Sequence, residues 1–189
     1  MTDEWHDVCT LCFGVFYVHV NPDLLKGFDD LVDSIVESLE PTARQRNQVL
    51  RIVAHSGPIW IAADQGRATQ VISNLNTNSC KSSPPFISIS VQIGRQGDQV
   101  VISVEDEGFG ISPEDLAEIY APFFRSDRKV IRNEVGTGLG LAISKTLVEL
   151  HGGEIKASST VGVGTRMQVI LPGASDAPTG QRTGSAPVD

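Results

Sequence analysis

The sequence predicts a two-layer α/β sandwich, in which helices cover one face of a β-sheet. Two neighbouring segments, 87–93 and 100–106, alternate apolar and polar residues as half-buried strands do, with a turn composition between them. Three other segments, 28–39, 67–81 and 140–150, repeat apolar residues at helical spacing, so each helix presents one apolar face. Amphipathic helices of this kind are expected to bury that face against the sheet.

Composition agrees with one soluble domain. The chain has 189 residues, 40% of them hydrophobic, which is enough for one core and too few for two generous ones. Fifteen basic and twenty-three acidic side chains leave a net charge of −8, so nucleic acid is not expected as a partner. The N-terminus is acidic where a secretory signal would be basic, and we interpret the three cysteines as reduced thiols of a cytoplasmic protein.

Residues 1–27 form an N-terminal segment of unclear role. The largely apolar run 8–20 is shorter than the ~20 residues of a membrane-spanning helix, so no membrane span is expected in this chain. The run could be a buried element, a partner-binding segment or the remnant of a neighbouring region. A single Cys-x-x-Cys with short histidine spacing is a poor zinc signature, and packed thiols are the preferred interpretation. The candidate metal ligands are His6, Cys9, Cys12 and His19.

The helical pattern at 28–39 is expected to begin near Asp29 and to stop before Pro41. Residues 49–54 and 59–63 are then predicted to be two short strands, joined by the turn composition His55-Ser56-Gly57-Pro58.

Asp64 is expected to cap the helix over 67–81. The predicted buried stripe of this helix is Ala68, Val71, Ile72, Leu75 and Ser79. Beside the stripe, Asn74, Asn78 and Lys81 are spaced so that all three project in the same direction. A polar outer face would explain one asparagine but not the whole set in register.

The strand over 100–106 places a carboxylate on its apolar side. The apolar face is made by every second residue, Val100, Ile102 and Val104. The same period puts Asp106 on that face, so its carboxylate is expected to point into a cleft. Gly108 and Gly110 follow, where the backbone can turn sharply and approach a bound molecule.

Ser112 and Pro113 are expected to open a short helix. It leads to Tyr120 and to the Pro-Phe-Phe-Arg run at 122–125. The polar segment 126–135 suits a mobile lid whose cations meet phosphate, and a solvated loop would have the same composition. The cations of this segment are Arg128, Lys129 and Arg132.

A second glycine cluster begins the helix at 140–150, and backbone N–H groups at a helix N-terminus bind phosphate. The cluster and its neighbours are Gly136, Thr137, Gly138, Leu139, Gly140 and Leu141. The helix is expected to pack Ile143, Leu147 and Leu150 inward and to end at Gly152-Gly153. Strands over 154–159 and 165–171 complete the sheet, and 173–189 are too poor in apolar residues to fold, so a disordered tail is expected there.

This ordered set of motifs resembles the GHKL ATP-binding family, which includes gyrase, heat-shock chaperones, histidine kinases and mismatch-repair proteins. Its last member is Gly162-Val163-Gly164-Thr165. Within the family, residues 28–172 look like the catalytic ATP-binding domain of a sensor histidine kinase. The resemblance implies the Bergerat (histidine-kinase ATPase-like) version of the sandwich, with a mixed, mostly antiparallel sheet covered on one face by helices.

The resemblance also implies roles for individual residues. In the family, the asparagine that matches Asn78 ligates Mg²⁺, the lysine that matches Lys81 touches a phosphate, and the aspartate that matches Asp106 accepts a hydrogen bond from the adenine amine. A neutral amide oxygen suits Mg²⁺ when a triphosphate supplies the negative charge. The other nucleotide-binding residues implied are Gly108, Gly110, Ile111, Tyr120, Gly136, Thr137, Gly138, Leu139, Gly140, Leu141 and Thr165. The implied catalytic set is Asn74, Lys81 and Arg125.

Asn74 distinguishes the subfamilies on chemical grounds. Gyrase-like and chaperone-like members carry a glutamate there, which serves as general base for water, and an amide cannot take that proton. Efficient hydrolysis is therefore not expected. We expect transfer of the γ-phosphoryl group to another acceptor instead. Two residues depart from the family pattern, Ser82 in place of an aromatic residue and Asn76 in place of an apolar one, and both could lower nucleotide affinity.

We therefore expect ATP and Mg²⁺ as cofactors and a histidine on a dimerisation domain, in trans or in a longer parent chain, as phosphoacceptor. A response regulator would be a further partner. His6-Asp7 resembles an acceptor motif, but the stretch from His6 to Pro22 is too short for the usual two-helix hairpin. The alternatives are a non-catalytic module that uses ATP to order the lid for a partner and, disfavoured by Asn74, a hydrolytic ATPase clamp.

Overall fold

The computed structural model describes residues 41–54, 60–61, 63–127 and 136–174. The hypotheses on the N-terminal segment, the helix at 28–39, the turn at 55–58, the lid cations and most of the tail lie outside these residues.

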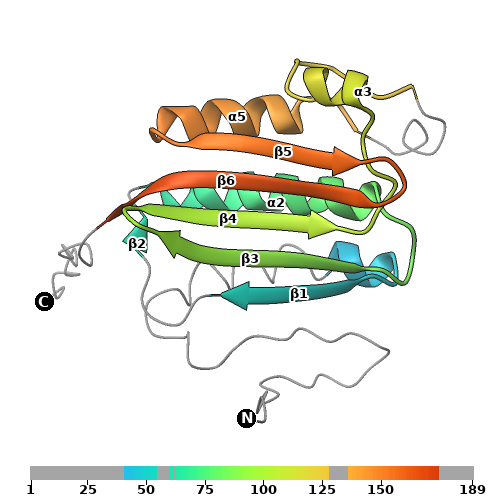
Figure 1. Cartoon of the computed structure of the whole chain (residues 1–189), viewed down its shortest axis with the longest axis horizontal. Coiled ribbons are helices and arrows are strands. Elements are labelled where there is room, and N and C mark those ends of the chain that lie inside the picture. The colour runs from blue at the N-terminus through green and yellow to red at the C-terminus, as the bar shows by residue number, and fades with distance from the viewer. Residues whose placement is uncertain (1–40, 55–59, 62, 128–135, 175–189) are drawn as a thin grey trace, which may run out of the picture.

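The described chain forms one sheet, in which β1 pairs with β3 in parallel and every other pair of strands is antiparallel. The strand order is β1-β3-β4-β6-β2, and β5 pairs with β6 (Figure 1). The strands are β1 (Val49–Ala54), β2 (Trp60–Ile61), β3 (Ser88–Gln96), β4 (Gln99–Asp106), β5 (Glu154–Thr160) and β6 (Gly164–Ala174). The predicted mixed and mostly antiparallel sheet is confirmed.

Two helices, α2 (Gln65–Lys81) and α5 (Gly140–Leu150), pack against each other and cover one face of this sheet (Figure 1). α2 contacts β3 and β4, and α5 contacts β5 and β6. The short helix α3 (Pro113–Glu118) lies beside β5. The expected two-layer sandwich is therefore confirmed.

The N-cap of α2 and its buried face are those that the sequence predicts. The Asp64 side chain caps it by accepting a 2.8 Å hydrogen bond from the Arg67 backbone N–H. All residues of the predicted stripe are buried, namely Ala68, Val71, Ile72, Leu75 and Ser79. Burial of this stripe against β3 and β4 orients the neighbouring polar positions of the helix.

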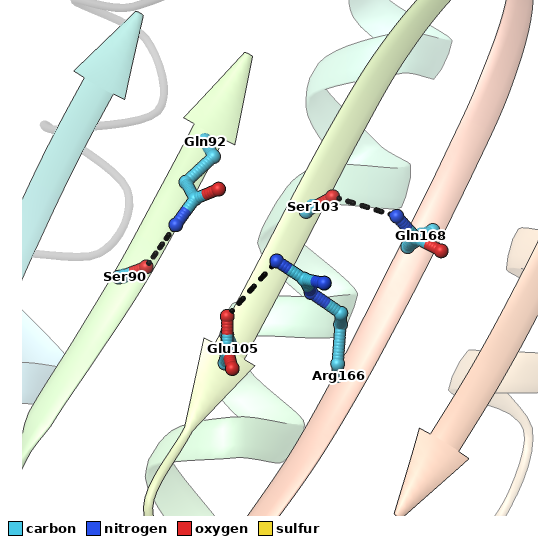
Figure 2. A network of polar contacts seen from close by, with 6 residues as sticks. All are labelled: Ser90, Gln92, Ser103, Glu105, Arg166 and Gln168. Atoms are coloured by element: carbon cyan, nitrogen blue, oxygen red, sulfur yellow. Dashed lines mark hydrogen bonds and ion pairs between the residues drawn. The ribbon is translucent and has the colours of Figure 1, made fainter. Parts of the chain in front are cut away.

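The opposite face of the sheet is polar. Gln168 Nε2 donates to Ser103 Oγ at 3.2 Å, and Arg166 and Glu105 form an ion pair of 3.3 Å across the same two strands (Figure 2). Both are directly opposed pairs of the β4–β6 ladder, where side chains are close enough to interact. Cross-strand polar pairs of this kind satisfy polar side chains on this face, where Ser103 is buried and Glu105 and Arg166 remain partly exposed.

Helix α5 turns a different face inward from the one its hydrophobic residues predict. Ser144 and Val148 are its buried residues, whereas Ile143 is 40% exposed and Leu150 is 75% exposed. The expectation that Ile143 and Leu150 pack inward is wrong, and Leu147 is only partly buried. The cause is the contact with α2, where the Ser144 hydroxyl accepts a hydrogen bond from Asn74, so that a small polar residue occupies the interface.

Three boundaries also differ from the expectation. Residues 41–45 are helical, although no helix was expected from Pro41 onward, and the fixed φ of proline is compatible with a helix. Of the described residues in the strand predicted at 59–63, β2 includes Trp60–Ile61 and not Ala63. β6 continues to Ala174, beyond the expected end of the folded domain at 172, because Gly173 and Ala174 pair with β2 and this pairing needs no large side chains.

The orientation of α5 predicts unequal costs for two truncations on this helix. Val148→Ala should lower the free energy of unfolding by roughly 2 kcal/mol, since buried methyl groups and their contacts are lost. Leu150→Ala removes a larger side chain but should lower the free energy of unfolding by less than about 0.5 kcal/mol, because the Leu150 side chain is already exposed to water. Urea unfolding of both variants measures the difference, and a larger cost for Leu150→Ala would contradict the observed packing.

Candidate functional site

A cavity of about 310 Å³ opens beside α2 and the start of α5. Its wall includes the last two turns of α2, Asp106 at the end of β4, Thr165 near the start of β6 and the glycine cluster that precedes α5. A volume of this size is within the range of small-molecule and cofactor sites. Segments far apart in the sequence therefore meet around one ligand-sized space.

Most of the predicted site residues line this cavity. They are Asn74, Asn78, Lys81, Asp106, Ile111, Arg125, Gly136, Thr137, Gly138, Gly140, Leu141 and Thr165. The α2 spacing accounts for the first three, because burial of the apolar stripe leaves the asparagines and the lysine on the cavity wall.

Gly108, Gly110, Leu139 and Tyr120 do not belong to this wall. A Cβ at Gly108 would collide with the Ser82 carbonyl oxygen, and one at Gly110, where φ is +64°, would collide with the Thr160 carbonyl. These two glycines thus permit close packing of the protein's own backbone, whereas the sequence suggested approach to a bound molecule. Leu139 is the N-cap residue of α5.

Tyr120 is held by packing. Its ring lies 5.4 Å from Lys145 Nζ, its hydroxyl is buried with no partner among the described residues, and burial raises its pKa to about 12.

Sequence reasoning missed several cavity residues. They are Leu75, Thr77, Ser79, Asp115, Ile119, Phe124, Ser126 and Met167. Ser79 could have been found, because it follows Asn78 directly and ends the buried stripe. Asp115 and Ser126 had no local signal, since the 2.5 Å hydrogen bond between their side chains joins α3 to the segment that follows the aromatic run.

The Asp106 carboxylate is the most deeply placed ionisable group of the cavity, with 3% of its surface exposed. Burial raises its pKa, and hydrogen bonds from the Ser79 hydroxyl and from the backbone N–H groups of Gly108 and Thr165 oppose that shift. The Gly108 N–H donates to Oδ1 at 3.0 Å. Because these donors favour the ionised form, Asp106 offers the cavity hydrogen-bond acceptors.

Asn74 joins α2 to α5 at the cavity wall. Its amide nitrogen lies 3.4 Å from the Gly140 carbonyl oxygen and 3.3 Å from Ser144 Oγ. A carbonyl can only accept, which assigns the nitrogen end of the amide to α5. Asn74 therefore ties the helix that begins at the glycine cluster to α2, and it carries no group that could take a proton from water.

Gln48 supports the site through hydrogen bonds to the segment that follows α2. Nothing in its sequence context predicted this role. The side chain is 1% exposed, and Nε2 lies 2.9, 3.0 and 3.2 Å from the carbonyl oxygens of Cys80, Ser83 and Pro84. The chain between them includes Ser82, whose carbonyl accepts from the Phe109 N–H at 2.9 Å. Gln48 thus holds in place the segment after α2, which in turn contacts the loop that follows Asp106.

The family is decided by comparison with known proteins. The model of the histidine kinase-, DNA gyrase B-, and HSP90-like ATPases matches residues 63–175, more than half of the chain. The chain belongs to this family. The resemblance to the GHKL family that its motifs carry is thereby confirmed. No helix in the described ranges has both the length and the apolar character needed to cross a membrane.

Similar proteins within the family are sensor kinases. The chain is 36% identical to the sensor histidine kinase WalK of Bacillus subtilis over 140 residues, which are 73% of this chain and 23% of WalK. It is 35% identical to ZraS of Salmonella typhimurium over 145 residues, 76% of this chain and 30% of ZraS. The chain thus spans about a quarter of the length of these relatives.

Solved structures of sensor histidine kinases have the same fold as this chain. The mycobacterial sensor histidine kinase MprB superimposes with a TM-score of 0.66 at 28% identity, covering 76% of this chain and 95% of that one. Full-length ShkA in complex with AMPPNP superimposes with a TM-score of 0.70 at 26% identity, covering 80% of this chain and 31% of ShkA.

Removal of the Gln48 amide should destabilise the fold. Gln48→Met removes the amide donor from the carbonyl oxygens of Cys80, Ser83 and Pro84, and among the described residues only Cys80 keeps another contact, from Arg46 at 3.4 Å. This loss should cost about 2 kcal/mol even though the unpartnered Oε1 is removed as well. Gln92→Met, on the exposed polar face of β3, is the matched control and should cost less than about 0.5 kcal/mol. Equal urea midpoints for the two variants would show that the Gln48 contacts contribute nothing.

The buried carboxylate should make stability depend on pH in a defined direction. Burial raises the folded-state pKa of Asp106 above its ordinary value of 3.8, so the folded protein keeps the proton to a higher pH than the unfolded chain does. The stability of the wild type relative to Asp106→Asn should therefore fall as pH rises from about 4, and level off once the folded protein has ionised.

Urea unfolding at a series of pH values measures this difference. Asp98→Asn, which removes an exposed carboxylate from the turn between β3 and β4, controls for the loss of one surface charge. A relative stability that rises with pH would contradict the assignment.

Proposed function

We propose that this chain is the ATP-binding catalytic part of a two-component sensor histidine kinase. It transfers the γ-phosphoryl group to a histidine on a dimerisation domain, supplied in trans or by a longer parent chain. The observation that carries the proposal is the single cavity that combines a buried carboxylate, Asp106, with an amide and two cations, Asn78, Lys81 and Arg125. The similarity to WalK, ZraS and MprB supports the kinase class.

Each group has a task that its chemistry suits. Asp106 accepts a hydrogen bond from the 6-amino group of adenine, and Lys81, Arg125 and the backbone N–H groups of 136–141 face the phosphates. The site also fits Mg²⁺, because the Asn78 amide oxygen can ligate it together with triphosphate oxygens. Bound there, Mg²⁺ would neutralise phosphate charge.

Transfer requires the bond from the γ-phosphorus to the bridging oxygen of ADP to break and a bond to an imidazole nitrogen to form. The imidazole proton must leave, and Asn74 cannot accept it. A carboxylate beside the acceptor histidine would serve as that base. This arrangement favours transfer over hydrolysis, because no group at Asn74 activates water. A cytoplasmic location and a response regulator as later phosphoryl receiver are parts of the same proposal, and they rest on the similarity to sensor kinases.

The metal role of Asn78 predicts the effect of its removal. Calorimetry should show ATP binding that Mg²⁺ strengthens, and Asn78→Ala should lose more than tenfold of the affinity measured with Mg²⁺ while changing the affinity without Mg²⁺ much less. Gln70→Ala, at an exposed position of the same helix, should bind like the wild type. Unchanged Mg²⁺ dependence in Asn78→Ala would place the metal elsewhere.

The transfer step has its own test. The chain is incubated with γ-labelled ATP and a dimerisation domain that carries an acceptor histidine, and acid-labile label should appear on that domain with little free phosphate. A domain whose acceptor histidine is replaced by alanine should stay unlabelled. Rapid phosphate release would favour the hydrolytic clamp, and tight binding without transfer would favour the non-catalytic module. Label on this chain that is lost in His6→Ala would make His6 the acceptor.

A further inference from the structure

Ser159, near the end of β5, connects three parts of the site through one hydroxyl. Its Oγ accepts from the Ile111 backbone N–H at 2.8 Å, donates to the Gly164 carbonyl oxygen at 2.7 Å and lies 2.9 Å from Thr165 Oγ1. Ser159 does not line the cavity, whereas Thr165 does. Any influence of Ser159 on a ligand must therefore pass through a neighbour.

Counting protons determines the direction of the Ser159–Thr165 hydrogen bond. A serine hydroxyl has one proton, and a carbonyl oxygen can only accept, so the Ser159 proton points at Gly164. Thr165 must then be the donor in the bond between the two hydroxyls. Ser159 uses its two lone pairs for Ile111 and Thr165, and its hydrogen-bonding capacity is filled.

Thr165 is left with acceptor capacity alone. Its hydroxyl proton is held by Ser159, while the lone pairs of Oγ1 remain for the cavity. Asp106 is the partner of Thr165 across the β4–β6 ladder and also lines the cavity, and its carboxylate is an acceptor as well. Two adjacent side chains therefore present acceptors to the ligand, and the side-chain donor that could have met a carbonyl oxygen is turned away.

We propose that Ser159 is a positioning residue that keeps Thr165 an acceptor and thereby selects 6-amino purines over 6-oxo purines. The inference rests on the proposed nucleotide-binding function. A 6-amino group donates to both acceptors, whereas a 6-oxo group faces two oxygens and finds no donor on either of these two side chains. When Ser159 is replaced by alanine, the Thr165 hydroxyl can rotate and donate to the 6-oxo group.

The test compares ATP with inosine triphosphate, in which a carbonyl replaces the 6-amino group. Calorimetry gives the ATP-to-ITP affinity ratio, which should be high in the wild type. It should fall several-fold, to about tenfold, in Ser159→Ala, the range expected when one neutral hydrogen bond is gained or lost. Ser158→Ala, at the exposed neighbouring position of β5, is the matched control and should keep the wild-type ratio.

A double-mutant cycle separates orientation from scaffolding. In Thr165→Val, which keeps the shape but has no hydroxyl, adding Ser159→Ala should leave the ratio unchanged. A loss of the Ile111 and Gly164 bonds alone would weaken both nucleotides equally and leave the ratio at the wild-type value. Should Ser159→Ala fail to fold, Ser159→Cys keeps a side chain there but offers Thr165 only a weak acceptor, and the same ratio is measured.

The outcomes distinguish this inference from the proposed function. Failure of the wild type to bind ATP would contradict the proposed function itself. Selective ATP binding by the wild type with an unchanged ratio in Ser159→Ala would overturn the inference and leave the function standing. A fall in the ratio that persists in the Thr165→Val background would show that Ser159 acts by another route, and it would also overturn the inference.

Discussion

The burial of one carboxylate is the constraint on which the rest of the site depends. Removing a carboxylate from water is costly unless donors replace the lost hydration. Asp106 receives hydrogen bonds from the loop after β4, from β6 and from Ser79 on α2. The sheet register, the rotation of α2 about its axis and the path of the loop must all be correct for one group to be satisfied. A site built in this way holds its acceptor in place before any ligand binds.

The glycine-rich motifs divide into two kinds by what they contact. Around Asp106 they let backbones converge, since a side chain at Gly108, Gly110 or Gly164 would collide with the backbone of Ser82, Thr160 or Asp106 respectively. The residues before α5 instead form part of the cavity wall, and Gly138 among them also lets the backbone of Phe123 and Phe124 approach. The first set of glycines thus builds the end of the cavity that holds the buried acceptor, and the second lies where phosphates are proposed to bind.

The contact between α2 and α5 links architecture to chemistry. An amide at position 74 donates to Gly140 and Ser144 and so fastens the start of α5, which in turn determines that the helix buries Ser144 and Val148. A carboxylate there could not donate in this way, although it could activate water. The structure therefore gives Asn74 a bonding role that is consistent with a transferase and unsuited to a hydrolase.

The sequence by itself determined the elements and much of the cavity wall, because these depend on local patterns. The Asp64 cap follows from the preference of aspartate for the N-cap. The periods of strand and helix determine the buried stripe of α2, the inward side of β4 that carries Asp106 and the spacing of Asn74, Asn78 and Lys81. Tertiary structure alone decided which side of α5 is buried, the pairing of β2 with β6, the carbonyl contacts of Gln48 and the hydroxyl contact of Ser159 with Thr165. Each of these is a contact between elements, and a residue's own sequence neighbours carry no record of which distant donor or acceptor it will meet.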